Sequence, residues 1–375
     1  MPPPFPRSLP MTDLDQILEP GAVIGILGGG QLGRMLSVAA SRLGFTTHIY
    51  EPAANPPAGH VADRVTTAAY EDEAALRAFA QTVDVITYEF ENIPTSALDI
   101  LEDLKPIRPG REALRVSQDR LTEKTFLQEL GLATAPFAEV DDAASLEVAL
   151  EKVGTPSILK TRRFGYDGKG QMRIMHPEEA PEALAAMQGA PAVLEGFVPF
   201  SHEVSVIAAR SLNGKVACYD PGENVHLEGI LSTTTVPANL TTGQSMDAVL
   251  MAGKILNALD YVGVLAVEIF VTAHGLVVNE IAPRVHNSGH WTQEGCTIDQ
   301  FEQHIRAITG WTIGNGARYA DVVMENLIGE DVGRIADLAR DPDCAIHLYG
   351  KAETKPGRKM GHVNRVIHTE GREGY

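Results

Sequence analysis

Two glutamates, Glu268 and Glu280, carry the clearest signal for chemistry, because one hairpin brings them together. They lie in the run "GVLAVEIFVTAHGLVVNEIAPR" (263–284), which is typical of two strands that turn near His274. The two carboxylates are equidistant from that turn and face each other with roughly 5 Å between Cβ atoms. Like charges so placed are destabilising unless a cation lies between them, and carboxylates beside Asn279 favour Mg²⁺ that bridges substrate phosphates. The sequence therefore predicts a metal site; a one-residue register slip, which turns one glutamate to solvent, is the alternative.

The stretch after the second glutamate, "RVHNSGHWTQEGC" (284–296), is rich in hydrogen-bond donors and lacks a continuous apolar face. His286 and His290 have the i,i+4 spacing of a zinc pair on a helix, but the Asn-Ser-Gly between them argues against a helix. We predict a polar loop whose donors contact an anionic substrate, with a purely structural loop as the alternative. The predicted donors are Arg284, His286, Asn287 and Ser288.

A basic, glycine-rich stretch, "RRFGYDGKGQ" (162–171), follows the apolar strand "SILK". Such a loop suits a lid that closes on nucleotide phosphates, and Lys160 at the strand end supplies a point charge for them. Glu195, at the end of an apolar strand, and the nearby Glu203 suit the hydroxyls of a ribose. The alternative, a solvated hairpin loop, leaves Lys160 unexplained.

Another glycine turn, "GGGQLG" (28–33), follows the buried strand "AVIGIL" and precedes a helix. It has the G-x-G-x-x-G spacing of a dinucleotide site, and Glu51 ends the next strand. The helix N-terminus favours an anion there. Packing of the helix on the sheet, or an anion other than a dinucleotide, explains the same turn. The three spaced glycines are Gly28, Gly30 and Gly33.

The elements that position these residues form three parts. Alternating strands and helices in 21–118 indicate a Rossmann-like parallel sheet with helices on both faces. Residues 119–198 hold a helix, short strands and the basic loop, which is typical of a small α+β lid unit. From 199 to 375 the strand pattern becomes antiparallel. The proline-rich residues 1–20 are predicted to be a flexible extension.

Composition limits the classes of partner. The 375 residues include 31 Lys+Arg and 49 Asp+Glu, a net charge of -18, which argues against nucleic acid but allows a local basic pocket for one phosphate. Three cysteines that lie far apart, without a CxxC pair, predict a reducing, cytoplasmic compartment. Neither a secretory signal nor an apolar run of about 18 residues is present, so no membrane is expected.

In this order, Lys160, the basic loop, Glu195 and the pair of Glu268 and Glu280 resemble the ATP-grasp superfamily. Within it, five motifs between about residues 22 and 365 are similar to those of the ATP-dependent N5-carboxyaminoimidazole ribonucleotide synthetases of purine biosynthesis. The resemblance implies an α/β and α+β, three-lobed ATP-grasp fold, with a Rossmann-like pre-ATP-grasp domain, a small central lid domain and a C-terminal mixed-sheet domain. It also implies a homodimer. The five motifs are "GILGGGQLGRML", "YEFENIP", "RRFGYDGKGQ", "NEIAPRVHNSGHWT" and "PGRKMGHVN".

The resemblance implies a reaction as well. In the family, ATP and bicarbonate carboxylate 5-aminoimidazole ribonucleotide to N5-carboxyaminoimidazole ribonucleotide, with release of ADP and phosphate. ATP phosphorylates bicarbonate, and the substrate's amine captures the carboxyphosphate or the CO₂ released from it. Mg²⁺ is the implied metal, with Mn²⁺ as its substitute. The sequence offers no obvious covalent nucleophile, so positioning and charge stabilisation are expected to carry the rate.

The family pattern assigns site residues to this sequence in overlapping groups. The implied metal ligands are Glu268 and Glu280, and the implied catalytic residues are Arg284, His286, Asn287 and Tyr166. The implied ATP contacts are Arg120, Lys160, Gly165, Tyr166, Asp167, Gly168, Lys169, Gly170, Gln171, Glu195, Val198, Glu203, His226, Asn279 and Glu280. The implied ribonucleotide contacts are Gln31, Leu32, Glu89, Tyr166, Arg284, His286, Asn287, Ser288, Lys351 and Arg358, with Arg284, Lys351 and Arg358 converging on one 5′-phosphate.

Three other functions remain open from the residues. A formate-using glycinamide ribonucleotide transformylase shares the lobes, the Mg²⁺ and the acyl-phosphate strategy. A nicotinamide dehydrogenase could be built on Gly28, Gly30, Gly33 and Glu51. The third is a nucleotide-binding regulator without catalytic activity.

Overall fold

The computed structural model describes residues 17–165 and 169–367. Three predicted site residues, Tyr166, Asp167 and Gly168, lie outside the described residues. So does most of the predicted N-terminal extension. Cys218, Cys296 and Cys344 are free, as their spacing predicted.

The N-terminal part is a four-stranded parallel sheet in which the first strand lies between the second and the fourth. Ile24 and Ile26 of the first strand pack against the helix that follows the glycine turn, whereas Leu27 packs with the next two helices. Helices therefore cover both faces, as predicted, because successive strand residues point to opposite sides. The elements are β1 (Val23–Leu27), α1 (Gln31–Arg42), β2 (Thr46–Tyr50), η2 (Pro57–His60), β3 (Arg64–Thr66), α2 (Glu73–Ala80), β4 (Val85–Tyr88), α3 (Thr95–Glu102) and α4 (Arg111–Ser117).

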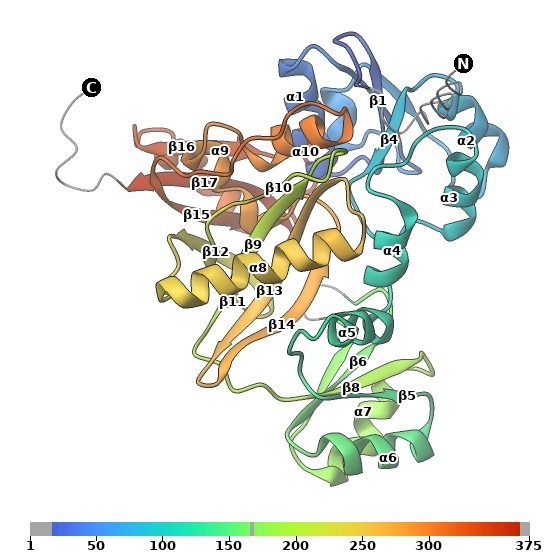
Figure 1. Cartoon of the computed structure of the whole chain (residues 1–375), viewed down its shortest axis with the longest axis vertical. Coiled ribbons are helices and arrows are strands. Elements are labelled where there is room, and N and C mark those ends of the chain that lie inside the picture. The colour runs from blue at the N-terminus through green and yellow to red at the C-terminus, as the bar shows by residue number, and fades with distance from the viewer. Residues whose placement is uncertain (1–16, 166–168, 368–375) are drawn as a thin grey trace, which may run out of the picture.

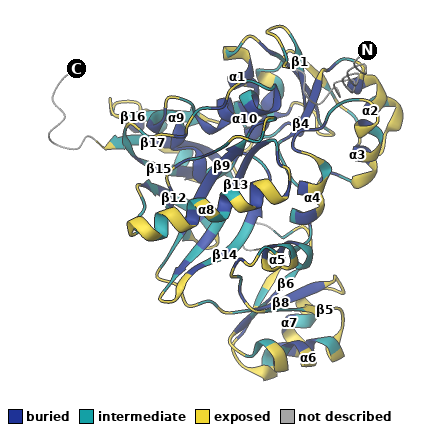
Figure 2. Cartoon of the chain, in the orientation of Figure 1, coloured by how far each residue is buried: buried dark blue, intermediate teal, exposed yellow. Residues whose placement is uncertain are grey.

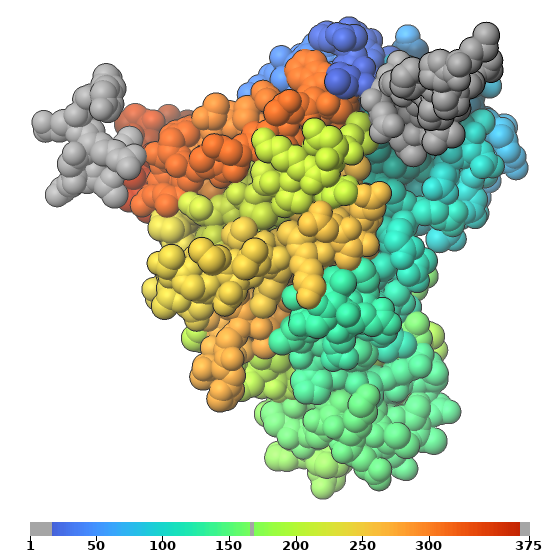
Figure 3. Space-filling view, in the orientation of Figure 1, coloured from blue at the N-terminus to red at the C-terminus, as the bar shows by residue number. Residues whose placement is uncertain are grey.

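The central part is a four-stranded antiparallel sheet with the order β5-β8-β6-β7, and it projects as a separate lobe (Figures 1 and 3). Two helices pack on one face, against Leu159 and Leu194 among others. Lys160 and Glu195 follow these leucines in their strands and therefore lie on the opposite face. The elements are α5 (Arg120–Glu129), β5 (Phe137–Val140), α6 (Ala143–Val153), β6 (Ser157–Thr161), β7 (Gln171–Ile174), η3 (Pro177–Glu179), α7 (Ala180–Ala186) and β8 (Ala192–Gly196).

The C-terminal part is a nine-stranded sheet whose named strands pair antiparallel. One isolated parallel bridge, from Thr134 to Val278, joins its edge to the segment before β5. The elements are β9 (His202–Arg210), β10 (Val216–Cys218), β11 (Gly222–Leu227), β12 (Ile230–Val236), α8 (Thr242–Ala258), β13 (Gly263–Thr272), β14 (Gly275–Ala282), η4 (Asn287–Gly289), α9 (Thr292–Gly295), α10 (Gln300–Ile308), β15 (Asp321–Ile328), η5 (Gly329–Arg334), α11 (Ile335–Leu338), β16 (Cys344–Leu348) and β17 (Lys359–Ile367).

The two faces of this large sheet carry different partners. Leu265 and Val267 of β13 pack with α8, whose outer side is exposed (Figure 2). Val264 and Ala266 face the other way, into a core shared with α10 and α1. Glu268 continues this second series, so it points to the side of the sheet away from α8.

The N-terminal part is fixed to the C-terminal part through α10. Arg42 of α1 forms ion pairs with Asp299 and Glu302 at 3.1 and 2.9 Å. Thr87 of β4 shares a hydrogen bond of 2.8 Å with the buried ring of His304. Among the helices of 17–165 and 169–367, none is long and apolar enough to cross a membrane.

Candidate active site

Glu268 and Glu280 are direct neighbours on adjacent strands, as the hairpin predicted. The turn itself pairs Thr272 with Gly275, a register that would bring Glu268 opposite Asn279. A bulge at Asn279 adds one residue to β14 and shifts the partner of Glu268 to Glu280. The predicted pairing is therefore confirmed, and the bulge is what produces it.

The two carboxylates differ in their surroundings. Glu268 is 14% exposed in its side chain, and burial together with the charge of Glu280 raises its pKa. The Glu280 side chain is 38% exposed, and burial acts on it in the same direction, but three cations together outweigh burial and lower the pKa of Glu280. They are Arg120, whose guanidinium lies 2.9 Å away, then Lys160 and Lys124. The pair therefore combines one ionised carboxylate with one that resists ionisation until another positive charge arrives.

Helix α5 brings three charged residues to this hairpin, two of which the sequence analysis missed. Arg120, Glu123 and Lys124 have i, i+3 and i+4 spacing and so share one face of the helix. The Lys124 ammonium donates to the carbonyl of Asn279 at 2.6 Å. Glu123 accepts from the backbone of Ile281 at 2.6 Å, and burial plus the charge of Glu280 raises its pKa to about 8.

Lys160 and Glu195 meet on the open face of the central sheet. Their Nζ and Oε2 atoms lie 2.9 Å apart, and the Lys124 Nζ approaches the same oxygen at 3.2 Å. Because the Glu195 side chain is 4% exposed and pairs with both lysines, the structure corrects its predicted role as a ribose contact. It neutralises the two lysines instead. Burial outweighs the opposing effect of Glu195 and lowers the pKa of Lys160.

Glu203 and His226 lie together at the other end of the site. They come from neighbouring strands, β9 and β11, and His226 Nδ1 is 3.0 Å from Glu203 Oε2. Burial disfavours the charged ring, but the carboxylates of Glu203 and then Glu268 together outweigh it and raise the pKa of His226. The sequence predicted both residues as ATP contacts, and the structure places them beside each other.

The loop after β14 is a short 3-10 turn, η4, and not the i,i+4 helix of a zinc pair. The His286 ring caps it, with Nδ1 2.8 Å from Ser288 Oγ and Nε2 3.5 Å from Glu268 Oε1. His290 is buried and accepts from Gln300 at 3.0 Å, so it belongs to the scaffold. Burial, then the charge of Arg284, lowers the pKa of His286 well below its usual value.

Two predicted substrate donors of this loop form hydrogen bonds within the protein. Ser288 is 1% exposed and bonds to His286 and Ser205, so its predicted contact with substrate is wrong. Asn287 exchanges two amide hydrogen bonds with Asn326, at 2.9 and 2.7 Å, which corrects its predicted role as a free donor. Both residues shape the loop from within.

Arg284 lies beside the N-terminal part. Its guanidinium pairs with Glu91 at 2.9 Å, in the motif "YEFENIP". Lys351 and Arg358 lie on the loop between β16 and β17, where Lys351 donates to the carbonyl of Lys359 and Arg358 to that of Glu353. Each of the three cations thus has a partner within the chain, and their convergence on one 5′-phosphate stays a prediction.

Lys359 was missed by the sequence analysis and lies close to the site. Its charge acts on Glu268, His226 and His286. It starts β17, far along the chain from these residues. No spacing in the sequence pointed to it.

The described part of the basic loop is anchored to β6. Thr161 donates its backbone N–H to the carbonyl of Gly170 at 2.8 Å, and a side chain at Gly170 would collide with Thr161. Gly165 lies next to the guanidinium of Arg120. The described lid residues Gly165, Lys169, Gly170 and Gln171 thus adjoin β6, and Val198 follows β8 in a half-buried position.

The first glycine turn is closed by two carboxylates of the chain itself. The Gly29 amide donates to Glu51 at 2.8 Å. Glu89 lies at the N-terminus of α1, the position that attracts anions. Three amides donate to it, those of Gly30 at 2.6 Å, Leu32 at 3.1 Å and Gly33 at 3.0 Å.

This arrangement contradicts the dinucleotide interpretation of the turn. A pyrophosphate would need the amides that Glu89 occupies, and a ribose would need the Glu51 carboxylate that Gly29 occupies. Gln31 starts α1, and the next residue, Leu32, donates its amide to Glu89, so their predicted contacts with the ribonucleotide stay a prediction. The Glu89 carboxylate explains the glycines instead, because a side chain at Gly28 or Gly30 would collide with it.

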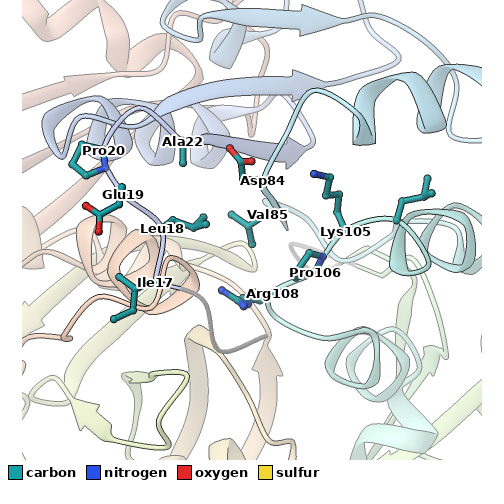
Figure 4. Close-up of a pocket in the computed structure, with 11 residues that line it drawn as sticks. Ile17, Leu18, Glu19, Pro20, Ala22, Asp84, Val85, Lys105, Pro106 and Arg108 are labelled. Atoms are coloured by element: carbon teal, nitrogen blue, oxygen red, sulfur yellow. The ribbon is translucent and has the colours of Figure 1, made fainter. Parts of the chain in front are cut away.

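The cavity in Figure 4, of about 490 Å³, lies elsewhere. It is lined by residues before β1, by Asp84 and Val85, and by the segment from Leu104 to Arg108. None of these lining residues belongs to the predicted site.

Three family models match the chain in succession. They are the ribonucleotide synthetase preATP-grasp domain over residues 22–118, the ATP-grasp domain over 125–301 and the phosphoribosylaminoimidazole carboxylase C-terminal domain over 322–372. The N5-carboxyaminoimidazole ribonucleotide synthase of Brucella melitensis is 54% identical over 352 residues, which cover 93% of this chain and 97% of that protein. The enzyme of the same name from Bacillus subtilis is 43% identical, covering 95% of this chain and 94% of its own. The chain belongs to the N5-carboxyaminoimidazole ribonucleotide synthase family.

Solved structures agree with this assignment. The ADP complex of an N5-carboxyaminoimidazole ribonucleotide synthetase superposes with a TM-score of 0.91 at 42% identity, covering 94% of each chain. The Aspergillus clavatus synthase, solved with ADP and 5-aminoimidazole ribonucleotide, gives 0.87 at 33% identity over 93% of this chain and 94% of its own. The predicted fold, family and ligase class are confirmed, and the dehydrogenase, transformylase and regulator are set aside.

Proposed function

We propose that the residues around the Glu268 and Glu280 pair bind ATP and a divalent cation and carboxylate 5-aminoimidazole ribonucleotide with bicarbonate, releasing ADP and phosphate. The observation that carries this proposal is the meeting of the β13–β14 hairpin with α5 and the central sheet. There Arg120 pairs with Glu280, and Lys124 joins Asn279 to Glu195.

The triphosphate of ATP fits between these elements. Arg120, Lys124 and Lys160 bring three positive charges against the carboxylates of Glu195 and Glu280, which leaves one positive charge in excess. This local balance lets a chain of net charge -18 accept a polyanion. Glu203 and His226 then lie toward the nucleoside, and the described lid residues Gly165, Lys169, Gly170 and Gln171 toward the phosphates.

Mg²⁺ fits the chemistry of the carboxylate pair. The two carboxylates face each other across adjacent strands, and burial first, then the charge of Glu280, raises the pKa of Glu268. A hard cation relieves that repulsion, and carboxylate oxygens are its preferred ligands. When bound, the ion neutralises charge on the phosphates. Mn²⁺ takes the same ligands.

The reaction proceeds in two displacements. A bicarbonate oxygen bonds to the γ-phosphorus of ATP as the bond to ADP breaks, giving carboxyphosphate. The substrate's amine then bonds to the carboxyl carbon, directly or through released CO₂, phosphate departs and the amine loses one proton. Arg284 and His286 lie where they can hold the anionic carboxyl group, and the three cations hold the phosphates.

The ribonucleotide is proposed to lie between the N-terminal and C-terminal parts. Arg284 already pairs there with Glu91 across the junction. Gln31, Leu32 and Glu89 line the N-terminal side. Lys351 and Arg358 line the C-terminal side, where they offer charges for a 5′-phosphate.

The setting is proposed to be a cytoplasmic homodimer. The free cysteines and the absence of a membrane-spanning helix among the described residues support this compartment. Light scattering on purified protein tests the dimer, which predicts twice the mass of the 40.3 kDa chain.

Phosphate release from ATP tests the activity directly. The proposal predicts that release in bicarbonate buffer rises strongly when 5-aminoimidazole ribonucleotide is added. Formate with glycinamide ribonucleotide should give no such rise. Release that ignores the aminoimidazole substrate, or that responds to formate instead, would contradict the proposal.

A further inference from the structure

The ring of His286 has a fixed orientation in the site. Its Nδ1 lies 2.8 Å from Ser288 Oγ and 3.4 Å from the Ser288 backbone nitrogen, while Nε2 lies 3.5 Å from Glu268 Oε1. A backbone N–H can only donate. Nδ1 therefore accepts, and in the neutral ring the hydrogen is on Nε2, the nitrogen that faces Glu268 and the reaction centre.

A second serine supports the same assignment. Ser205 Oγ donates to Ser288 Oγ at 2.7 Å, which leaves the hydrogen of Ser288 to donate to His286 Nδ1. Ser205 is also the strand partner of Glu268 on β9. Both serines are at most 2% exposed, so water does not compete for these bonds. Ser205, Ser288 and His286 therefore form a chain of hydrogen-bonded side chains that ends beside Glu268.

The backbone of His286 is clamped as well. The buried Gln300 accepts from its N–H at 2.9 Å and donates to its carbonyl at 2.7 Å. A flip of the ring would place carbon against Ser288 Oγ and lose the bond to Nδ1. The orientation is therefore set by both ends of the residue.

We propose that Ser288 is a positioning residue that keeps the hydrogen of the neutral His286 ring on Nε2, so that His286 acts as a hydrogen-bond donor to an anionic carboxyl oxygen and not as a base. This inference rests on the proposed role of His286 in the reaction. Ser205 supports Ser288 in this role, because it donates the hydrogen bond that orients the Ser288 hydroxyl. The sequence had placed Ser288 on the substrate, whereas the structure places it behind the histidine.

Two replacements of His286 separate a donor at Nε2 from an acceptor there. The amide nitrogen of glutamine reaches the position of Nε2, whereas that of asparagine reaches only the position of Nδ1. We expect His286→Gln to retain about tenfold more kcat than His286→Asn, the value of one hydrogen bond to a charged group. Equal losses in the two variants would overturn the donor assignment. Wild-type kcat in both would instead show that His286 has no role in the reaction, which is a failure of the proposed function.

Ser288→Ala tests the positioning role. It should lower kcat by about 10- to 100-fold while KM for ATP stays unchanged, because only the support of the ring is lost. Ser211→Ala is the matched control: Ser211 is 4% exposed and donates to Asn213 at 2.6 Å in a hairpin turn, so it loses a comparable bond away from the site. A loss in Ser288→Ala no larger than in the control would contradict the inference.

Nitrogen NMR on histidine-labelled protein reads the ring directly and does not depend on activity. The signal of His286 is assigned by its absence in His286→Gln. We expect an unprotonated Nδ1 and a protonated Nε2 in the wild type, and a mixture of the two forms in Ser288→Ala. A hydrogen on Nδ1 in the wild type would refute the proposal even if every kinetic prediction held.

Discussion

Two glutamates of this chain, Glu89 and Glu280, each meet hydrogen-bond donors of the protein, but the donors differ in kind. Glu89 lies at the N-terminus of α1 and accepts from three backbone amides. Glu280 lies on a strand edge and is held by the full charge of Arg120. Burial outweighs the amides and raises the pKa of Glu89, whereas Arg120, with Lys160 and Lys124, outweighs burial and lowers the pKa of Glu280.

The difference separates structural from catalytic use of the same residue type. Amides satisfy the hydrogen bonds of Glu89 and close the glycine turn, so no cation is needed there. Arg120 neutralises one of two facing carboxylates, and the charge of Glu268 is left for a ligand. The site of Glu89, whose hydrogen bonds are satisfied, stabilises the fold, whereas the Glu268 and Glu280 pair is expected to bind a cation.

The largest effect is expected from Glu280→Gln. It removes a metal ligand and the partner of Arg120, so kcat should fall by roughly 10³-fold, the several kcal/mol that metal catalysis supplies. Phosphate release measures the loss, and circular dichroism checks that the fold persists. Glu330→Gln, at an exposed site, is the control. Retained turnover would show that Glu280 has no catalytic role.

Glu89→Gln should act on stability first. The variant puts an amide NH₂ against backbone donors, and the unfolding free energy should fall by roughly 2 kcal/mol at neutral pH. Urea denaturation measures it. An unchanged midpoint would mean that the amides of the glycine turn do not depend on Glu89.

The same variant carries a pH dependence. Because the pKa of Glu89 is raised in the folded protein, its proton stabilises the fold fully below pH 4.5, and this contribution is lost as the pH rises through the folded pKa. The stability advantage of the wild type over Glu89→Gln should therefore shrink as the pH rises above 4.5, by at most about 1.4 kcal/mol per pH unit. Urea denaturation at a series of pH values measures it, and an advantage that grows with pH would have the wrong sign.

Glu268→Gln should have the smallest effect on stability and the opposite sign. It removes a carboxyl group whose ionisation Glu280 opposes, so in the presence of a chelator the free energy of unfolding should rise by about 1 kcal/mol or less. Added Mg²⁺ with ADP should no longer raise the melting temperature. A lower stability in chelator would contradict the repulsion between the pair.

Much of the site could be predicted because it depends on strands and turns. The pairing of Glu268 with Glu280 followed from a hairpin centred on His274. The true turn pairs Thr272 with Gly275, and a bulge at Asn279, which was not predicted, restores the pairing of the two glutamates. The glycine turn and its helix were also found at their positions. The carboxylate that fills the turn was not predicted, since Glu89 follows β4 and lies fifty-nine residues beyond Gly30.

The missed residues depend on contacts between parts of the chain. Glu123 and Lys124 share one helical face with the predicted Arg120, a spacing that the sequence shows, but only the packing of α5 against β14 brings that face to the carboxylate pair. Lys359 gives no such signal, because only the packing of β17 brings it near Glu268. Ser288 was assigned to substrate because a serine in a polar loop does not reveal its burial.

Binding of Mn²⁺ in the presence of ADP, followed by electron paramagnetic resonance, tests the central claim that the Glu268 and Glu280 pair is the open cation site. The account predicts one tightly bound ion in the wild type and in Glu89→Gln, and a loss of that ion in both Glu268→Gln and Glu280→Gln. An ion that stays bound in both of these variants, or that disappears from Glu89→Gln, would contradict it.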